Sequence, residues 1–334
     1  MQTPYAGNNI TGVDGLIAVD KVGNKIRFYD PSSLREVKAF DAPEPSAHEL
    51  AIAHDRSIAC VPLYGDGIYG GNKNPNNKIM VVDLKRQELV DVFALDGMAA
   101  PHGMAMTSQG KLWVVADIPN KLIRVDPLTR TIEAVYDCPG KGAHQLALTP
   151  DQTKLYVSSK EGDLGVFDLA QNRFVGAIAL RASGITGGNG AGSEGVMPTP
   201  DGRRLVVIDN AANDLRVIDI ATDREVDRVP LTMNAFSNVK RSRLAKLMFS
   251  PDARHLVVTS YSSGNAWVID AADYRSQTLV PVAKGPQGMT FDAASKTVLV
   301  ASHDSGLLTR VDLASRRAVA AYDGGGGIEV LAYY

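Results

Sequence analysis

The feature of this 334-residue sequence that most constrains its fold is a sevenfold repeat of short strand-like segments, each ending in an aspartate. Successive aspartates lie roughly 42 to 53 residues apart, a spacing typical of propeller blades. Polar turns and further strand-like runs flank every segment, which gives four strands per repeat, and no convincing amphipathic helix is visible. The repeat therefore predicts an all-β fold, a single seven-bladed β-propeller with four-stranded antiparallel blades. The seven segments are 26–30, 79–83, 122–126, 164–168, 215–219, 266–270 and 308–312.

The two ends of the chain predict how the ring closes. The chain enters at 15–20, which corresponds to the second strand of a blade, and it ends in an unpartnered apolar run at 328–333. Pairing this last run into the first blade closes the ring and removes exposed strand edges. The expected blades are about 10–45 with 327–334, 46–97, 98–141, 142–183, 193–234, 243–284 and 285–324.

Composition excludes several partners. The formal net charge is −2, so we expect no nucleic acid or anionic membrane as a partner, since these select for basic surfaces. Apolar runs are too short to span a membrane. We expect a small-molecule substrate and a monomer or weak homo-oligomer. Residues 1–5 do not resemble a signal peptide, which favours the cytoplasm, with the periplasm as the alternative if a leader was removed. Cys60 and Cys138 are expected to be free thiols.

The recurring aspartates are expected to build turns. One stands at the same place in every repeat, immediately before a short polar turn. Aspartate side chains accept hydrogen bonds from the backbone of the turn that they open. Repetition in all seven blades therefore indicates that these aspartates stabilise turns and are not catalytic.

A second repeat differs among the blades and is the candidate site. The segments 47–52, 101–106 and 143–148 are near copies that place His48, His102 and His144 at one position, and 193–198 places Glu194 there. These are innermost strands, which line the axis of a propeller, so one position in each faces the others at one height. The next two blades offer Ala245 and Gln287.

Three imidazoles and one carboxylate converging on an axis suit a divalent transition metal: Zn, Fe, Mn, Co or Ni. Calcium would require mostly oxygen ligands. The structural alternative is that the histidines hydrogen-bond one another, water and backbone carbonyls. Whether Glu194 binds the ion directly or orients a histidine stays open.

Further candidates lie on the same rim. Long connections at 64–77 and 183–192 are expected to wall the pocket or act as a lid. Tyr64, Lys160, Tyr261 and His303 are the candidates for acid, base or substrate contact. Asp117 and Asp209 also fall at rim turns, and the basic run 240–243 either holds a substrate carboxylate or is a solvated loop.

Blade signatures carry a family resemblance. Ser250-Pro251-Asp252 with Leu256-Val257-Val258, and the run 155–158 followed by 165–168, resemble the YVTN-type and lactonase-type seven-bladed propellers over the whole chain. Pro101-His102-Gly103 resembles the strand starts of the streptogramin-inactivating lyases, which use a divalent ion and channel histidines.

The resemblance and the ring of histidines together lead us to expect a metal-dependent lyase, in which the metal polarises a carbonyl and a base removes the adjacent proton. A lactonase that uses metal-activated water is the hydrolytic alternative. A non-catalytic propeller that binds a metal, a haem or a protein is the other alternative.

Overall fold

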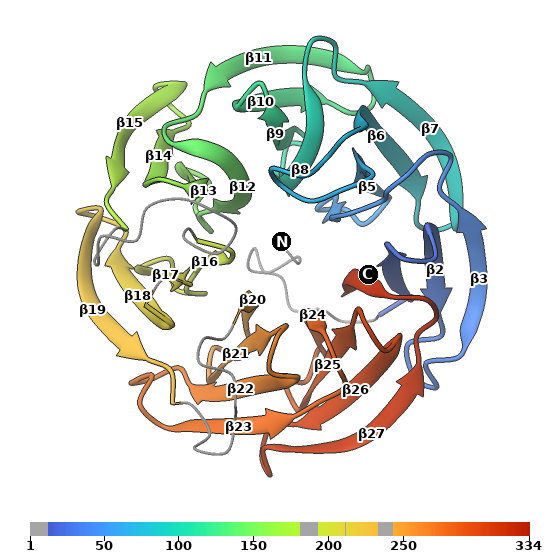
Figure 1. Ribbon diagram of the computed structural model, residues 1–334, viewed down its shortest axis with the longest axis vertical. Helices are drawn as coiled ribbons and strands as arrows, with labels where there is room; N and C mark the ends of the chain where they lie inside the picture. Colours follow the sequence, from blue (N-terminus) through green and yellow to red (C-terminus); the bar gives the residue numbers. More distant parts are fainter. Residues whose placement is uncertain (1–12, 181–192, 211, 233–242) are drawn as a thin grey trace.

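The computed structural model describes residues 13–180, 193–210, 212–232 and 243–334. These residues form seven four-stranded antiparallel sheets arranged around one axis, and no helix occurs among them (Figure 1). The predicted all-β, seven-bladed propeller is confirmed. Of the residues described, none belongs to a helix long and apolar enough to cross a membrane.

Each blade runs from an inner strand at the axis to an outer strand at the rim of the ring. The first three blades are β28 (Ile328–Tyr333), β1 (Leu16–Asp20), β2 (Lys25–Tyr29), β3 (Glu36–Asp41); β4 (Ala51–Ile52), β5 (Ile58–Gly65), β6 (Pro75–Asp83), β7 (Glu88–Ala94); and β8 (Ala99–Met106), β9 (Leu112–Ile118), β10 (Lys121–Asp126), β11 (Thr131–Asp137). The next two are β12 (Lys141–Leu148), β13 (Lys154–Glu161), β14 (Leu164–Asp168), β15 (Arg173–Ile178); and β16 (Val196–Pro198), β17 (Arg204–Asp209), β18 (Asp214–Asp219), β19 (Arg224–Pro230). The last two are β20 (Leu244–Phe249), β21 (His255–Ser260), β22 (Asn265–Asp270), β23 (Gln277–Pro281); and β24 (Pro286–Phe291), β25 (Thr297–Ser302), β26 (Leu307–Asp312), β27 (Arg317–Asp323).

The C-terminal strand closes the ring as predicted. β28 pairs antiparallel with β1, with Leu16 opposite Tyr333 and Ile17 opposite Ala332. Figure 1 shows the red C-terminal strand beside the blue first blade. The two ends of the sequence therefore hold the first blade together.

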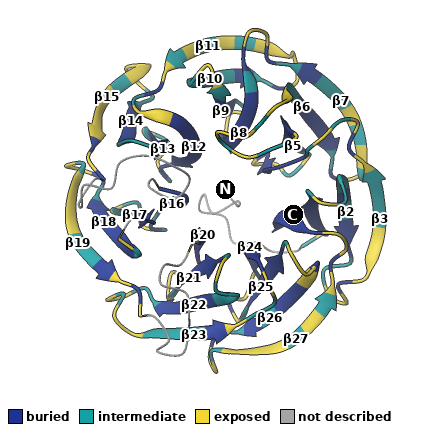
Figure 2. Ribbon diagram, in the orientation of Figure 1, coloured by how far each residue is buried: buried dark blue, intermediate teal, exposed yellow. Residues whose placement is uncertain are grey.

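Burial falls from the axis outward. The strands nearer the axis are mostly buried, whereas outer strands such as β11 alternate exposed and half-buried residues (Figure 2). Blades pack face to face, so both faces of a middle strand are covered and its sequence is a continuous apolar run. The outer strands face water on one side and keep the alternation typical of a half-buried strand.

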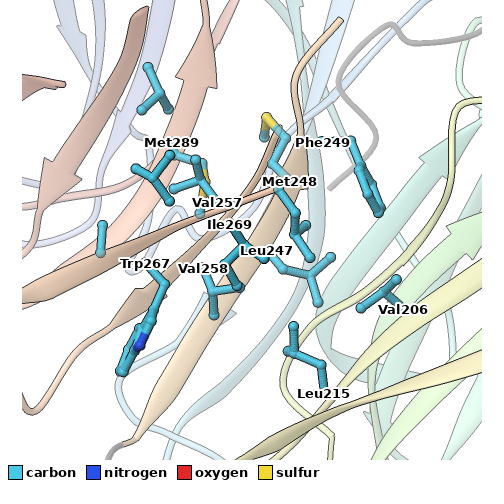
Figure 3. Packing of buried hydrophobic residues seen from close by; sticks show 14 of the residues in the cluster. Val206, Leu215, Leu247, Met248, Phe249, Val257, Val258, Trp267, Ile269 and Met289 are labelled. Carbon is cyan, nitrogen blue, oxygen red and sulfur yellow. The ribbon is translucent and has the colours of Figure 1, made fainter. Parts of the chain in front are cut away.

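The core lies between neighbouring blades. In Figure 3, Val206 and Leu215 of the fifth blade and Met289 of the seventh flank the sixth blade, which contributes Leu247 and Trp267. Each buried side chain of this size stabilises the fold by about 1.5–3 kcal/mol relative to an exposed one. The ring is thus held by contacts between blades as well as by the strands within them.

The repeated aspartates build turns, as expected. In each of the seven, the carboxylate accepts a hydrogen bond from a backbone N–H two or three residues later. The two cysteines are free and buried, which confirms the expectation for the thiols. Burial raises the pKa of Cys60 to about 12.

Candidate functional site

The predicted ring of inner-strand residues surrounds one pocket of about 300 Å³ on the propeller axis. The structure brings all four predicted ligands together. Ring centroids of His48 and His102 lie 4.4 Å apart, and those of His102 and His144 lie 4.0 Å apart. Glu194 accepts from His144 Nε2 at 2.8 Å. Ala245 and Gln287 also line the pocket, as their register predicts.

The first blade contributes a seventh residue that the sequence did not reveal. Glu329, on β28, lines the pocket and is buried. Its carboxylate oxygens lie 3.9 Å from His48 Nε2 and 3.7 Å from His303 Nε2. Gln287 Nε2 donates to it at 3.4 Å. Applying the same register to the C-terminal strand would have found it.

Each imidazole has a different hydrogen-bonding situation. His102 Nδ1 donates to the backbone carbonyl of His144 at 3.0 Å, which leaves the lone pair on His102 Nε2. His144 donates through Nε2 to Glu194, so its lone pair is on Nδ1. His48 Nδ1 is buried and has no hydrogen-bond partner in the part of the chain that the structure describes.

All three imidazoles are neutral at physiological pH. Burial, followed by the positive charges of Lys21 and Lys246, holds the pKa of His48 well below its usual range. Burial and the neighbouring histidines do the same for the pKa of His102. Burial and then Lys160 lower the pKa of His144 to about 4, although Glu194 opposes this. Neutral imidazole is the form that binds a metal.

Glu194 belongs to a buried triad with His144 and Lys160. One carboxylate oxygen accepts from His144 and the other lies 2.5 Å from Lys160 Nζ. Burial alone would raise the pKa of Glu194, but Lys160 and then His144 hold it far below its usual range. Both oxygens of Glu194 are therefore engaged, and it orients His144.

A second set of polar side chains stands one position further along the inner strands. The strand pairing shifts register at 101–104, 143–146, 244–247 and 286–289, so two consecutive residues face the axis at a β-bulge. Gln145 and Lys246 line the pocket in this way, and Glu49, which precedes β4 (Ala51–Ile52), lines it as well. The sequence-based prediction placed only one residue of each inner strand at the axis and therefore missed them. Their signal was a polar residue inside an otherwise apolar strand.

Glycines allow the inner strands to approach one another. A Cβ on Gly103 would lie 2.4 Å from the backbone oxygen of His144, and one on Gly288 would lie 2.9 Å from that of Glu329. Such contacts are with the backbone, which side-chain rotation cannot relieve. The glycine of Pro101-His102-Gly103 therefore lets the next blade come close enough for the imidazoles to meet.

The four candidates for acid, base or substrate contact all line the pocket. Tyr64 stacks on His48 with centroids 5.0 Å apart and donates to Asp117 at 2.5 Å. Burial raises the pKa of Asp117 to about 6.

The other candidates are engaged with acidic partners. Lys160 pairs with Glu194. Tyr261 donates to Asp304 at 2.5 Å, and His303 Nδ1 lies 3.2 Å from the same oxygen. Asp209 pairs with Arg216 at 2.6 Å and does not line this pocket.

The connection at 64–77 forms one wall of the pocket, as expected. Ile68 and Tyr69 line it, and the Tyr69 hydroxyl donates to Glu161 at 3.3 Å, in the fourth blade. A Cβ on Gly142, at φ +65°, would lie 2.4 Å from the Tyr69 ring, so glycine leaves the space that this ring occupies. The other expected wall, 183–192, and residues 240–242 of the basic run lie outside the described residues. Arg243 is described and lines the pocket.

Two solved structures show the same architecture. Kuenenia stuttgartiensis hydrazine synthase matches with a TM-score of 0.69 and 17% identity over 86% of this chain and 89% of that chain. A functionally unknown protein from Desulfotomaculum acetoxidans DSM 771 matches with a TM-score of 0.71 and 14% identity over 96% and 99%. At such identities the likeness shows the fold alone. Comparison with curated proteins finds no match.

A family comparison corrects the predicted function. The family described as the cytochrome D1 heme domain matches residues 108–332, and this is neither a lyase nor a lactonase family. The prediction of a metal-dependent lyase is wrong, and the YVTN and lactonase grouping is not confirmed. Blade signatures identify the fold, and proteins that share a fold can have many different activities. Histidines on the axis suit a bare ion as well as a haem iron, so they do not distinguish the two.

The match also bears on the expected cofactor. Haem iron is a transition metal, so the expected class of cofactor agrees with the family at that level. His144 and Glu194 lie inside the matched residues, whereas His48 and His102 precede them. Because the match covers more than half of the sequence, the chain belongs to the cytochrome D1 heme domain family.

Proposed function

We propose that this propeller binds haem in its axial pocket, with a histidine of the inner ring as ligand to the iron. The observation that carries the proposal is the group of three buried, neutral imidazoles at the pocket, in a chain of a haem-domain family. When bound, a haem supplies an iron centre for electron transfer or for binding a small ligand.

The donor set fits this cofactor. His102 is the proposed iron ligand, because its Nδ1 is held by a backbone carbonyl and its Nε2 keeps the lone pair. His48 supports the fit, since its buried Nδ1 has no hydrogen-bond partner in the described ranges. The two rings are 4.4 Å apart, too close to bind opposite faces of one haem, so a single imidazole is the expected ligand.

The rest of the lining suits a flat molecule that carries carboxylates. Ile68 and the rings of Tyr64 and Tyr69 offer apolar contact. Lys21 and Arg243 also line the pocket, and the side chain of neither forms an ion pair with another residue that the structure describes. Arg243 instead lies over the Tyr261 ring at 5.0 Å. Both cations are available for the acidic groups of a haem.

Titration of the purified protein with hemin tests the proposal. We expect a Soret band that shifts on binding and saturates at one equivalent. His102→Ala should abolish the shift or change its position, because it removes the ligand nitrogen. His54→Ala is the matched control, since His54 does not line the pocket.

Two outcomes would contradict the proposal. One is the absence of any Soret shift in the wild-type protein. The other is an identical shift in the His48→Ala, His102→Ala and His144→Ala variants. Metal analysis that finds one equivalent of a bare ion and no haem would replace it with direct chelation.

A further inference from the structure

Two imidazoles and one carboxylate lie in a chelating arrangement at the pocket. One ligand atom each from His48, Glu49 and His102 lies within 4.8 Å of the others, and all three residues are buried. Two histidines with one carboxylate form the donor set of non-haem iron sites and bind other divalent ions as well. The described residues therefore contain a set of ligands for a bare cation, and this set includes His102, the proposed haem ligand.

Lys246 forms an ion pair with the carboxylate of this group. Its Nζ lies 2.9 Å from Glu49 Oε1 and 2.8 Å from Glu49 Oε2. Gln145 Nε2 donates to Oε1 at 2.8 Å. Lys246 is 7% exposed and Glu49 is 2% exposed, so water does not screen this pair. A cation that used Glu49 would have to displace a buried ammonium.

The fold places the lysine there from the opposite side of the ring. Glu49 precedes β4 in the second blade, Gln145 is on β12 in the fourth and Lys246 is on β20 in the sixth. The same position is glycine in the third, fifth and seventh blades, at Gly103, Gly195 and Gly288. Long polar side chains thus alternate with glycines, which leaves the axis free for the three to meet.

We propose that Lys246 determines which metal cofactor the pocket accepts, by neutralising Glu49 and so excluding bare divalent cations. His48 and His102 then remain as neutral donors, and the one carboxylate of this group, that of Glu49, is already paired with Lys246. Divalent ions prefer sites that contain an anionic ligand. The iron of a haem does not need one from the protein, because its negatively charged macrocycle already balances the charge of the iron. This inference rests on the proposed haem-binding function and assigns Lys246 as a specificity-determining residue.

The test is the binding of Co²⁺ alone to Lys246→Met, followed by its visible absorption. We expect Lys246→Met to bind Co²⁺ at least tenfold more tightly than the wild-type protein and to show the bands of a protein-bound ion. The double variant Lys246→Met/Glu49→Gln should return to the wild-type affinity. Lys154→Met is the matched control, because it removes a lysine that pairs with Asp223 and does not line the pocket.

Equal Co²⁺ affinity in Lys246→Met and wild type would overturn the proposal. A gain that survives in the double variant, or that Lys154→Met matches, would also overturn it. Lys246→Gln is the second variant if Lys246→Met does not fold, since glutamine still donates to Glu49 without a charge, and the same gain is expected.

Hemin titration of the wild-type protein separates this inference from the proposed function. If hemin does not bind and Lys246→Met still gains Co²⁺, the haem proposal fails while the role of Lys246 in excluding cations stands. If hemin binds and Co²⁺ affinity is unchanged in Lys246→Met, only the assignment of Lys246 fails.

Discussion

Replacing Lys160 with methionine tests the buried triad beside the imidazoles. The substitution keeps most of the apolar stem but deletes the ammonium that lies 2.5 Å from Glu194. Lys160 is 5% exposed and Glu194 is 7% exposed, so the carboxylate would stay buried without its main partner. Removing one member of such a pair typically costs about 3–5 kcal/mol.

His144 still donates to Glu194 in this variant, so we expect the lower end of that range, about 3 kcal/mol. For a chain of this size the loss corresponds to a fall in Tm of about 4 °C. Urea unfolding, followed by the fluorescence of buried Trp113 and Trp267, measures the free energy of unfolding. Thermal unfolding followed by circular dichroism measures Tm.

The double variant Lys160→Met/Glu194→Gln removes both charges and should recover most of the loss. Lys25→Met is the surface control: Lys25 pairs with Asp41 at 2.5 Å, but their side chains are 36% and 78% exposed, and such pairs contribute about 1 kcal/mol or less. If Lys160→Met is as stable as Lys25→Met, or if the double variant is no better than the single one, the buried pair does not hold Glu194 as described.

Two further predictions concern Asp117 and Gly103. The folded-state pKa of Asp117, about 6, lies above its ordinary value of 3.8, so the folded protein holds this proton more tightly and loses stability as the pH rises through that window. Asp117→Asn escapes this loss and still accepts a hydrogen bond from Tyr64. Its stability relative to wild type should rise by about 2 kcal/mol between pH 4 and pH 7.5 in urea unfolding, and a constant difference would contradict the assignment. Gly103→Ala should cost about 3 kcal/mol and weaken hemin binding, because its Cβ would overlap backbone atoms of the next blade. Gly176→Ala, where nothing lies within 4 Å, should change neither, and equal effects of the two would refute the close-approach argument.

Much of the fold follows from local patterns that repeat. The seven aspartates act through hydrogen bonds within two or three residues, which sequence order alone arranges. The unpartnered strand at the C-terminus predicted ring closure because an open edge is unfavourable. The register of the inner strands predicted that His48, His102 and His144 meet, because symmetry places equivalent positions at one height on the axis.

The identity of the function did not follow from those patterns. Blade signatures describe how strands pack, and the same packing carries lyases, lactonases and haem domains. Three histidines indicate a transition metal but not whether a macrocycle surrounds it. The family match, and not the site residues, overturned the lyase prediction.

The sequence by itself determined the architecture and the ring of imidazoles, since both depend on a period that can be counted along the chain. Only the tertiary structure decided which partner each polar group has. Glu49 and Lys246 come from the second and sixth blades and form an ion pair at the axis, and a bulge in the sixth blade turns Lys246 toward it. Glu194 pairs with Lys160 and His144 of the neighbouring blade. These contacts join residues far apart in the sequence. Together with burial they set the charge around the imidazoles, and no local sequence pattern predicts either the contacts or the burial.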